Sequence, residues 1–278
     1  MRAIEEKFRS LGRRGEGALI GYVTCGDPMP DYTLKIAKAL ISGGIDMLEL
    51  GIPFSDPIAD GPIIQRAAMR ALKAGVRPLT VMETAKKISA AHPNTPIIIL
   101  TYFNLIFKAG LERFFNLAKE NDIDGVIVPD LSVEEASEYK AVAERYDVDT
   151  IFLAAPSTPN GRLKKIIEYS SGFIYLVSVH GVTGPRERLR KESIDFVRRA
   201  SSMSGGKIPI AVGFGISKPS HVRRVIAEGA DGAIVGSKIV KIMEENIDNE
   251  ARMLSKIESF IRVLKKSTVK NSSSAMRF

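Results

Sequence analysis

Short apolar runs alternate with amphipathic stretches along almost the whole chain, and this alternation constrains the fold more than any other sequence feature. The apolar runs are nearly continuous in Ile, Val and Leu, as expected of parallel strands that are buried on both faces. The sequence predicts strands at residues 19–24, 47–51, 97–101, 125–129, 150–154, 173–178, 208–212 and 233–236. It predicts helices between them at residues 32–42, 81–91, 111–120, 133–145, 162–169, 194–201 and 219–228.

This alternation implies βαβ units and a parallel sheet, and eight strands is the number that closes a (β/α)8 barrel. The rival architecture is an open doubly wound sheet, which would carry a Gly-rich dinucleotide-binding turn after its first strand. The turn at residues 24–28 reads TCGDP instead, and neither GxGxxG nor GxxxxGK[ST] occurs in the chain. The predicted fold is therefore α/β, a single (β/α)8 TIM barrel with an extra N-terminal helix.

Two segments fall outside the repeat. Ile4, Phe8 and Leu11 share one helix face, so residues 2–12 are expected to form a helix that plugs the bottom of the barrel. Residues 267–278 are polar and unpatterned, which predicts a frayed tail. The predicted barrel domain, with its N-terminal capping helix, therefore spans residues 1–266.

The charge balance and the cysteine content narrow the class of protein. The 40 Lys and Arg residues exceed the 32 Asp and Glu residues, for a net charge of +8. The basic residues are scattered, and no aromatic RNA-binding motif, helix-turn-helix or zinc-finger spacing accompanies them. No apolar run approaches the ~18 residues that a membrane-spanning helix needs, and the N-terminus shows no apolar core of a signal peptide. Cys25 is the single cysteine, so it cannot form a disulfide within the chain. We expect a cytoplasmic protein that binds neither nucleic acid nor membrane.

Glu49 is the most unusual residue in a predicted strand. It lies between Leu48 and Leu50, which point to the opposite face. If Glu49 faces the barrel interior, loss of water raises the pKa of its carboxyl toward the range where proton transfer is useful. The alternative is a structural acid that pairs with an interior base.

Two aspartates, Asp56 and Asp60, follow on a proline-bounded loop. Such residues serve as turn formers or as metal ligands. The histidines His92, His180 and His221 form no ligand-like pair, so the sequence predicts no metal site.

Glycines cluster in the loops after the last three predicted strands, and they indicate a phosphate site. The segments are GVTG at residues 181–184, GFGIS at residues 213–217 and GS at residues 236–237, where a helix opens. Glycine lets backbone N–H groups approach an anion, and a helix N-terminus favours negative charge.

Aromatic residues near strand ends either line a pocket or pack the barrel: Tyr22, Tyr102, Tyr175 and Phe214.

The segments GYVTCGDP, LELGIPFSDPIADGPIIQ, YLVSVHGVTG, VGFGIS and GAIVGS resemble the α subunit of tryptophan synthase, in order and over residues 15–240. The second segment is highly specific, whereas the glycine motifs would fit several phosphate-binding barrels. The resemblance implies a lyase of tryptophan biosynthesis that cleaves indole-3-glycerol phosphate to indole and glyceraldehyde 3-phosphate, with no cofactor in this chain.

At the positions that match the family's motifs, the resemblance implies that Glu49 is the general acid–base group and that Asp60 is the partner of the indole nitrogen. Phosphate binding falls on Gly184, Gly215, Gly236 and Ser237, and Thr183 matches a lid residue. The implied partner is a pyridoxal-phosphate β subunit in an α2β2 complex. Its contacts are expected at Pro53, Asp56 and Asn104.

Other functions share some of these features. A ribulose-phosphate epimerase would want metal-binding histidines near strand ends, and indole-glycerol phosphate synthase would want an interior lysine; neither is evident. A catalytically silent docking partner would not need both Glu49 and Asp60. Nucleic-acid binding is a third alternative, which a salt-dependent gel shift would test.

Overall fold

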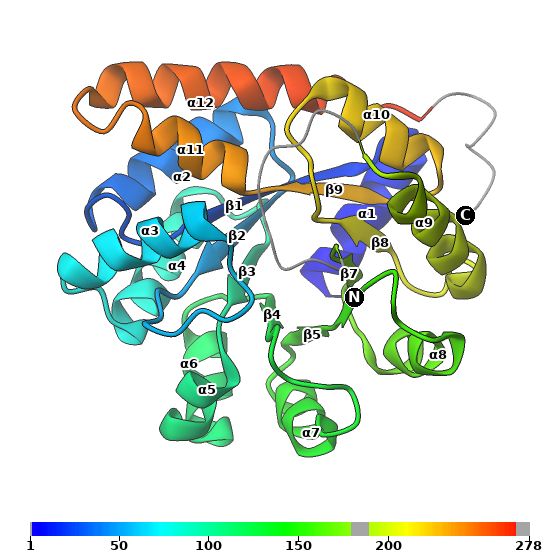
Figure 1. The fold of residues 1–278 in the computed structure, drawn as a ribbon. Coiled ribbons are helices and arrows are strands. Elements are labelled where there is room, and N and C mark those ends of the chain that lie inside the picture. The colour runs from blue at the N-terminus through cyan, green and yellow to red at the C-terminus, as the bar shows by residue number, and fades with distance from the viewer. Residues whose placement is uncertain (1, 179–188, 271–278) are drawn as a thin grey trace.

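The computed structural model describes residues 2–178 and 189–270, and its strands form a ring that helices surround (Figure 1). All paired strands are parallel. The strands are β1 (Ala18–Thr24), β2 (Met47–Gly51), β3 (Ile97–Leu100), β4 (Gly125–Ile127), β5 (Asp149–Ile151), β6 (Leu153–Ala154), β7 (Ile174–Leu176), β8 (Ile210–Val212) and β9 (Gly232–Val235). They follow one another in the order β5-β4-β3-β2-β1-β9-β8-β7-β6.

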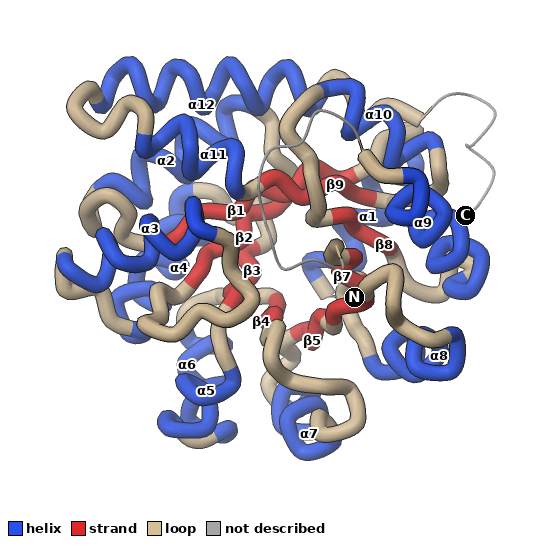
Figure 2. The backbone as a smooth tube through the Cα atoms, in the orientation of Figure 1, coloured by secondary structure: helices blue, strands red, loops and turns tan. Residues whose placement is uncertain are grey.

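The two ends of this order, β5 and β6, are consecutive pieces of one predicted strand, residues 150–154. Only Phe152 separates them, and its carbonyl accepts a hydrogen bond from the backbone N–H of Tyr175 at 3.0 Å. The chain itself therefore closes the ring, as the tube in Figure 2 shows. The predicted (β/α)8 barrel is confirmed.

Helix α1 (Ala3–Arg13) lies at one end of the ring, and the other helices cover the outside of the ring (Figure 2). These are α2 (Tyr32–Gly43), α3 (Pro62–Lys73), α4 (Pro78–Ala91), α5 (Phe103–Ala109), α6 (Leu111–Glu120), α7 (Ser137–Arg145), α8 (Asn160–Tyr169), α9 (Lys191–Ser204), α10 (Pro219–Ala227), α11 (Ser237–Glu244) and α12 (Glu250–Lys265). Among the described residues, no helix is both long and apolar enough to cross a membrane.

The helices differ from the prediction in extent and in number. Helix α7 begins at Ser137 rather than at residue 133, because a turn precedes it in which the N–H of Glu135 donates to the carbonyl of Ser132. Helices α3, α5 and α12 were not among the predicted ones. Helix α3 is the important addition, since it starts directly after the loop that carries Asp60.

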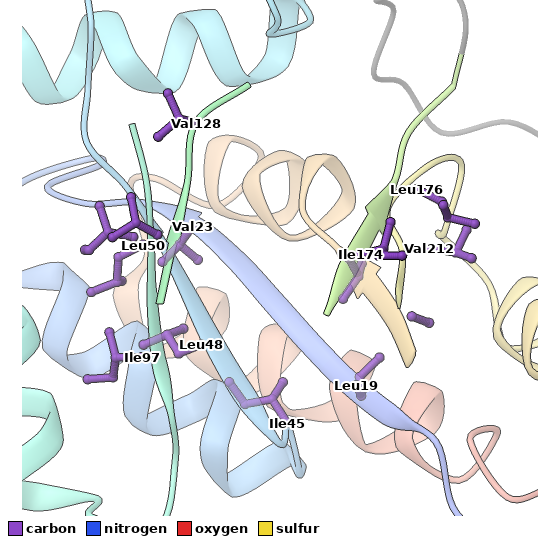
Figure 3. Packing of buried hydrophobic residues seen from close by; sticks show 14 of the residues in the cluster. Leu19, Val23, Ile45, Leu48, Leu50, Ile97, Val128, Ile174, Leu176 and Val212 are labelled. Atoms are coloured by element: carbon purple, nitrogen blue, oxygen red, sulfur yellow. The ribbon is translucent and has the colours of Figure 1, made fainter. Parts of the chain in front are cut away.

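Alternation along each strand divides the apolar residues into two layers. On β2, Leu48 and Leu50 face outward and join the core between strands and helices, part of which Figure 3 shows. Met47 belongs to the cluster inside the barrel, and Glu49, two residues along, points the same way. The predicted orientation of these residues is confirmed.

Helix α1 closes the amino end of the barrel, as predicted. Its buried residues Ile4, Phe8 and Leu11 belong to the same apolar cluster as the inward-facing strand residues. The ring of Phe8 lies 5.8 Å from that of Phe173. The barrel interior is therefore filled at this end and has room for a ligand only toward the other.

Carboxylates fix the strands at the same amino end. Asp46, just before β2, accepts a hydrogen bond from the backbone N–H of Leu19 at 2.7 Å. Asp124, just before β4, accepts one from Ile97 at 2.8 Å. Each bond ties the start of one strand to the start of its neighbour, and so supports the register on which the inward-facing positions depend.

The prediction of a frayed tail from residue 267 is wrong for its first residues. Ser267 and Thr268 are buried, and Val269 forms an antiparallel bridge with Glu16. Lys270 pairs with Asp231 at 3.2 Å. Polar residues hide this packing from a pattern analysis, because the segment is held by backbone hydrogen bonds and an ion pair rather than by apolar side chains. Residues 271–278 lie outside the described part.

Candidate active site

Glu49 is buried in the barrel interior, away from water. On the neighbouring strands its register partners are Tyr22 and Ile98. Its side chain is completely buried, and neither carboxyl oxygen has a hydrogen-bond partner among the described residues. Burial, and to a lesser degree the nearby charge of Asp60, raises the pKa of Glu49 to about 8. At neutral pH this carboxyl therefore carries its proton.

Asp60 is held over the barrel by an aromatic residue from the next strand–helix connection. The hydroxyl of Tyr102 donates to Oδ2 of Asp60 at 3.0 Å and accepts from the N–H of Ala59 at 3.1 Å. The ring of Phe54 stacks on Tyr102 at 5.1 Å. Burial raises the pKa of Asp60 to about 6, while the bond from Tyr102 works in the opposite direction. This carboxyl is therefore mostly ionised at neutral pH.

A cavity of about 290 Å³ opens at the carboxyl ends of the strands, where barrels of this type carry their chemistry. Inward-facing strand residues form an apolar floor of Leu100, Ile127, Leu153 and Ile234. Asp60 stands in the wall. The connections after β7, β8 and β9 supply most of the polar part of the wall.

The structure brings most of the predicted site residues together. Six of them line this cavity: Asp60, Tyr175, Phe214, Gly215, Gly236 and Ser237. Tyr22 and Tyr102 do not line it; Tyr22 bonds to Thr24 at 3.2 Å and Tyr102 supports Asp60. Glu49 is also absent from the wall. Thr183 and Gly184 lie outside the described residues.

Backbone geometry prepares the polar wall for an anion. Gly236 is the N-cap of α11, whose first backbone N–H groups have no partner within the helix. Gly215 has φ +65°, a left-handed conformation that favours glycine. At Gly213 a Cβ would lie 2.2 Å from the ring of Tyr175, so only glycine leaves room for that ring.

Two cations in the same wall escaped the sequence analysis. Arg190 precedes α9 and Lys238 lies in the first turn of α11. No motif marks either residue, because Arg190 belongs to a basic run at residues 186–191 and Lys238 is one of many lysines on helices. A signal was available for Lys238, which follows the Gly236-Ser237 helix start directly.

The predicted partner contacts lie near Asp60 but differ in exposure. Asp56 and Asn104 are exposed, whereas Pro53 is buried within the chain. Ile58 and Phe107, on the same two segments, are 81% and 73% exposed. The hydrogen bond from Tyr102 to Asp60 links the two segments.

Cys25 and the carboxylates give no sign of thiol or metal chemistry in the described part of the chain. Burial raises the pKa of the Cys25 thiol to about 11, which suits a small core residue better than a nucleophile. No group of three or more His, Cys, Asp or Glu side chains is arranged to hold a metal ion among those residues.

Comparison with known proteins gives consistent matches. A family model described as tryptophan synthase alpha chain matches residues 8–269. The alpha chain of Methanocaldococcus jannaschii is 48% identical over 250 residues, 90% of this chain and 88% of the relative. A structure from the tryptophan synthase α2β2 complex of Pyrococcus furiosus has a TM-score of 0.82 and 40% identity, covering 90% of this chain and 98% of that one. Tryptophan synthase of Mycobacterium tuberculosis gives a TM-score of 0.87 at 33% identity, over 96% and 98%.

One class of barrel enzymes acts on small phosphorylated molecules, with the reacting groups and an anion-binding wall at the carboxyl ends of parallel strands. This chain falls in that class. Its family follows from the extent of the match. The chain belongs to the tryptophan synthase alpha chain family. It is a lyase that cleaves indole-3-glycerol phosphate in tryptophan biosynthesis.

The buried carboxyl of Glu49 should make stability depend on pH. Between about pH 4.5, where a glutamate in the unfolded chain ionises, and about pH 8, native Glu49 keeps a proton that the unfolded chain has released. The free energy of unfolding should therefore fall as pH rises through this window, by up to about 1.4 kcal/mol per pH unit for this group. Glu49→Gln removes this contribution, so its stability relative to the wild type should increase from pH 5 to pH 8 in urea unfolding.

The matched control is Glu245→Gln, which changes an exposed glutamate at the end of α11. Its stability relative to the wild type should stay nearly constant over the same range. A constant difference for Glu49→Gln as well would show that Glu49 ionises normally in the folded chain.

Proposed function

We propose that Glu49 and Asp60 carry out the cleavage of indole-3-glycerol phosphate, with Glu49 as the proton donor and acceptor and Asp60 as a fixed anion. One observation carries this assignment. Two carboxyls at the same end of the barrel have pKa values separated by their surroundings, about 8 for Glu49 and about 6 for Asp60. Such a separation is how a pair of acids takes on different roles near neutral pH.

The reaction needs a group that first gives and then takes a proton. Indole leaves only after its C3 atom is protonated, which places positive charge on the ring nitrogen. A base then removes the proton of the side-chain hydroxyl next to C3, the C3–carbon bond breaks, and its electron pair returns to the ring. The products are indole and the aldehyde of glyceraldehyde 3-phosphate. No other reactant is consumed.

Protonated Glu49 supplies the first proton, and as a carboxylate it accepts the second. Asp60, ionised and anchored by Tyr102, stabilises the positive charge on the ring nitrogen. Glu49 is held by no hydrogen bond to a described residue, so none has to break for its carboxyl to turn toward the substrate in the cavity.

The cavity orients the substrate by polarity. The apolar floor and the rings of Tyr175 and Phe214 suit indole, and Gly215, Gly236 and Ser237 suit the phosphate. By resemblance, Gly184 and Thr183 complete the phosphate site and the lid. We propose no cofactor in this chain, since proton transfer accounts for every step. A phosphorylated substrate does not cross a membrane unaided, which favours a cytoplasmic location.

Glu49→Gln should abolish nearly all turnover while the variant still folds and binds substrate. Loss of a general acid–base group costs ~10²–10⁴-fold, and the loss should lie at the upper end because one group serves two steps. The measurement is release of glyceraldehyde 3-phosphate from indole-3-glycerol phosphate under saturating substrate.

Asp124→Asn is the control, because it neutralises another buried carboxyl with a raised pKa, at the opposite end of the barrel. It should keep the wild-type kcat for the folded fraction. A Glu49→Gln variant that retains half of the wild-type rate would refute the assignment.

We further propose a pyridoxal-phosphate β subunit as partner, in an α2β2 complex like that named for Pyrococcus furiosus. Indole is apolar and would diffuse away, so direct transfer to a second active site favours docking at the face where it leaves. Asp56 and Asn104 are exposed there, and Ile58 and Phe107 present apolar side chains beside them. Docking orders the loop that carries Asp60, which gives a route to activation.

Cleavage should therefore be slow for the isolated chain and faster by ~10–100-fold with the β subunit, which needs only about 1.4–2.8 kcal/mol of differential binding. Phe107→Asp and Asp56→Ala should reduce this activation more than the basal rate. The measurement is the cleavage rate against added β subunit.

Val263→Asp is the control for Phe107→Asp, since it places the same charge at another exposed apolar side chain, on α12. It should leave the activation intact. A flat titration with wild-type protein, together with no detectable complex, would contradict the partnership.

A further inference from the structure

Arg190 and Lys238 both line the cavity, and their charged side chains have no partner among the described residues. Lys238 is half-buried in the first turn of α11, and Arg190 stands just before α9. The carbonyl of Arg190 accepts a hydrogen bond from the N–H of Ile194 at 3.2 Å, but neither side chain hydrogen-bonds to or forms an ion pair with another described residue. By contrast Lys241, one turn further along α11, pairs with Glu245 at 3.7 Å. Within residues 2–178 and 189–270, therefore, no side chain competes with a ligand for these two cations.

The charges in the cavity wall are unbalanced in a way that suits an anion. Two cations face the cavity, and Asp60 is the one carboxylate among the described wall residues. A phosphate monoester carries up to two negative charges at neutral pH and would be repelled by ionised Asp60. Backbone N–H groups at the start of α11 provide only partial positive charge. Full charges at the phosphate end offset the repulsion.

We infer that Lys238 and Arg190 bind the phosphate group of the substrate and make the cavity selective for dianionic phosphate monoesters. This inference rests on the proposed function, since it assumes that the phosphate lies in the polar wall formed by the connections after β7, β8 and β9. Ser193 and Ser217, also in the wall, add neutral donors beside the two cations. The backbone sets where the phosphate lies, and the side chains set how strongly its charge is held.

A group that holds the phosphate touches a part of the substrate remote from the breaking bond. Its contribution is therefore nearly equal in the ground state and the transition state, and its loss raises KM more than it lowers kcat. The contribution is also electrostatic, so salt weakens it. These two signatures separate a phosphate-binding role from a structural one.

The experiment compares Lys238→Met with Lys241→Met, which lose one positive charge from the same helix. We expect Lys238→Met to raise KM for indole-3-glycerol phosphate and Kd for glycerol 3-phosphate about 10-fold at low salt, equivalent to ~1.4 kcal/mol. Lys241→Met should stay within about two-fold of the wild type. Arg190→Met should act in the same direction as Lys238→Met. Raising the salt concentration should narrow the difference between wild type and Lys238→Met, and affinity for indole alone should not change.

Glycerol 3-phosphate binding, measured by calorimetry, separates this inference from the proposed function. If the wild type binds glycerol 3-phosphate in a manner that depends on Lys238 but cleaves no substrate, the inference stands and the proposed function fails. If Lys238→Met and Lys241→Met bind glycerol 3-phosphate equally well, the inference is overturned even when cleavage is normal. Absence of glycerol 3-phosphate binding by the wild type would overturn it too.

Discussion

A carboxyl group inside a barrel loses its hydration water, and this loss has a high cost in free energy. The burial of Glu49 therefore places two requirements on the structure. The barrel must hold the β2 register that turns Glu49 inward, because a shift of one residue would point Leu48 or Leu50 into the barrel interior instead. The group must also remain protonated near neutral pH, because no hydrogen bond within the described chain offsets the charge it would otherwise carry.

The rest of the barrel supports these two requirements from opposite ends. At the amino end, α1 fills the interior, and Asp46 and Asp124 tie neighbouring strands together. At the carboxyl end, Tyr102 fixes Asp60, and α3 begins just beyond it. The contacts that stabilise the fold thus lie at the amino end of the barrel, and the reacting groups lie toward the carboxyl end. This division is typical of the fold.

Much of this arrangement could be predicted because it depends on periodicity and on local chemistry. Continuous apolar runs indicate parallel strands, and a glutamate within one of them has few explanations other than function. The place of Lys238 in the cavity wall was missed, because the Gly236-Ser237 helix start before it is only a weak signal until the structure shows which way that helix start faces. The packing of Ser267 and Thr268 was missed for a similar reason: hydrogen bonds to distant backbone leave no pattern in the sequence.

The central claim is that burial keeps the Glu49 carboxyl protonated at neutral pH. It can be tested directly by following the ¹³C chemical shift of glutamate side-chain carboxyls through a pH titration, with the Glu49 signal assigned by its loss in Glu49→Gln. The account predicts a titration midpoint near 8, as the pKa of about 8 requires. A midpoint near 4.5, the ordinary value for a glutamate, would contradict it.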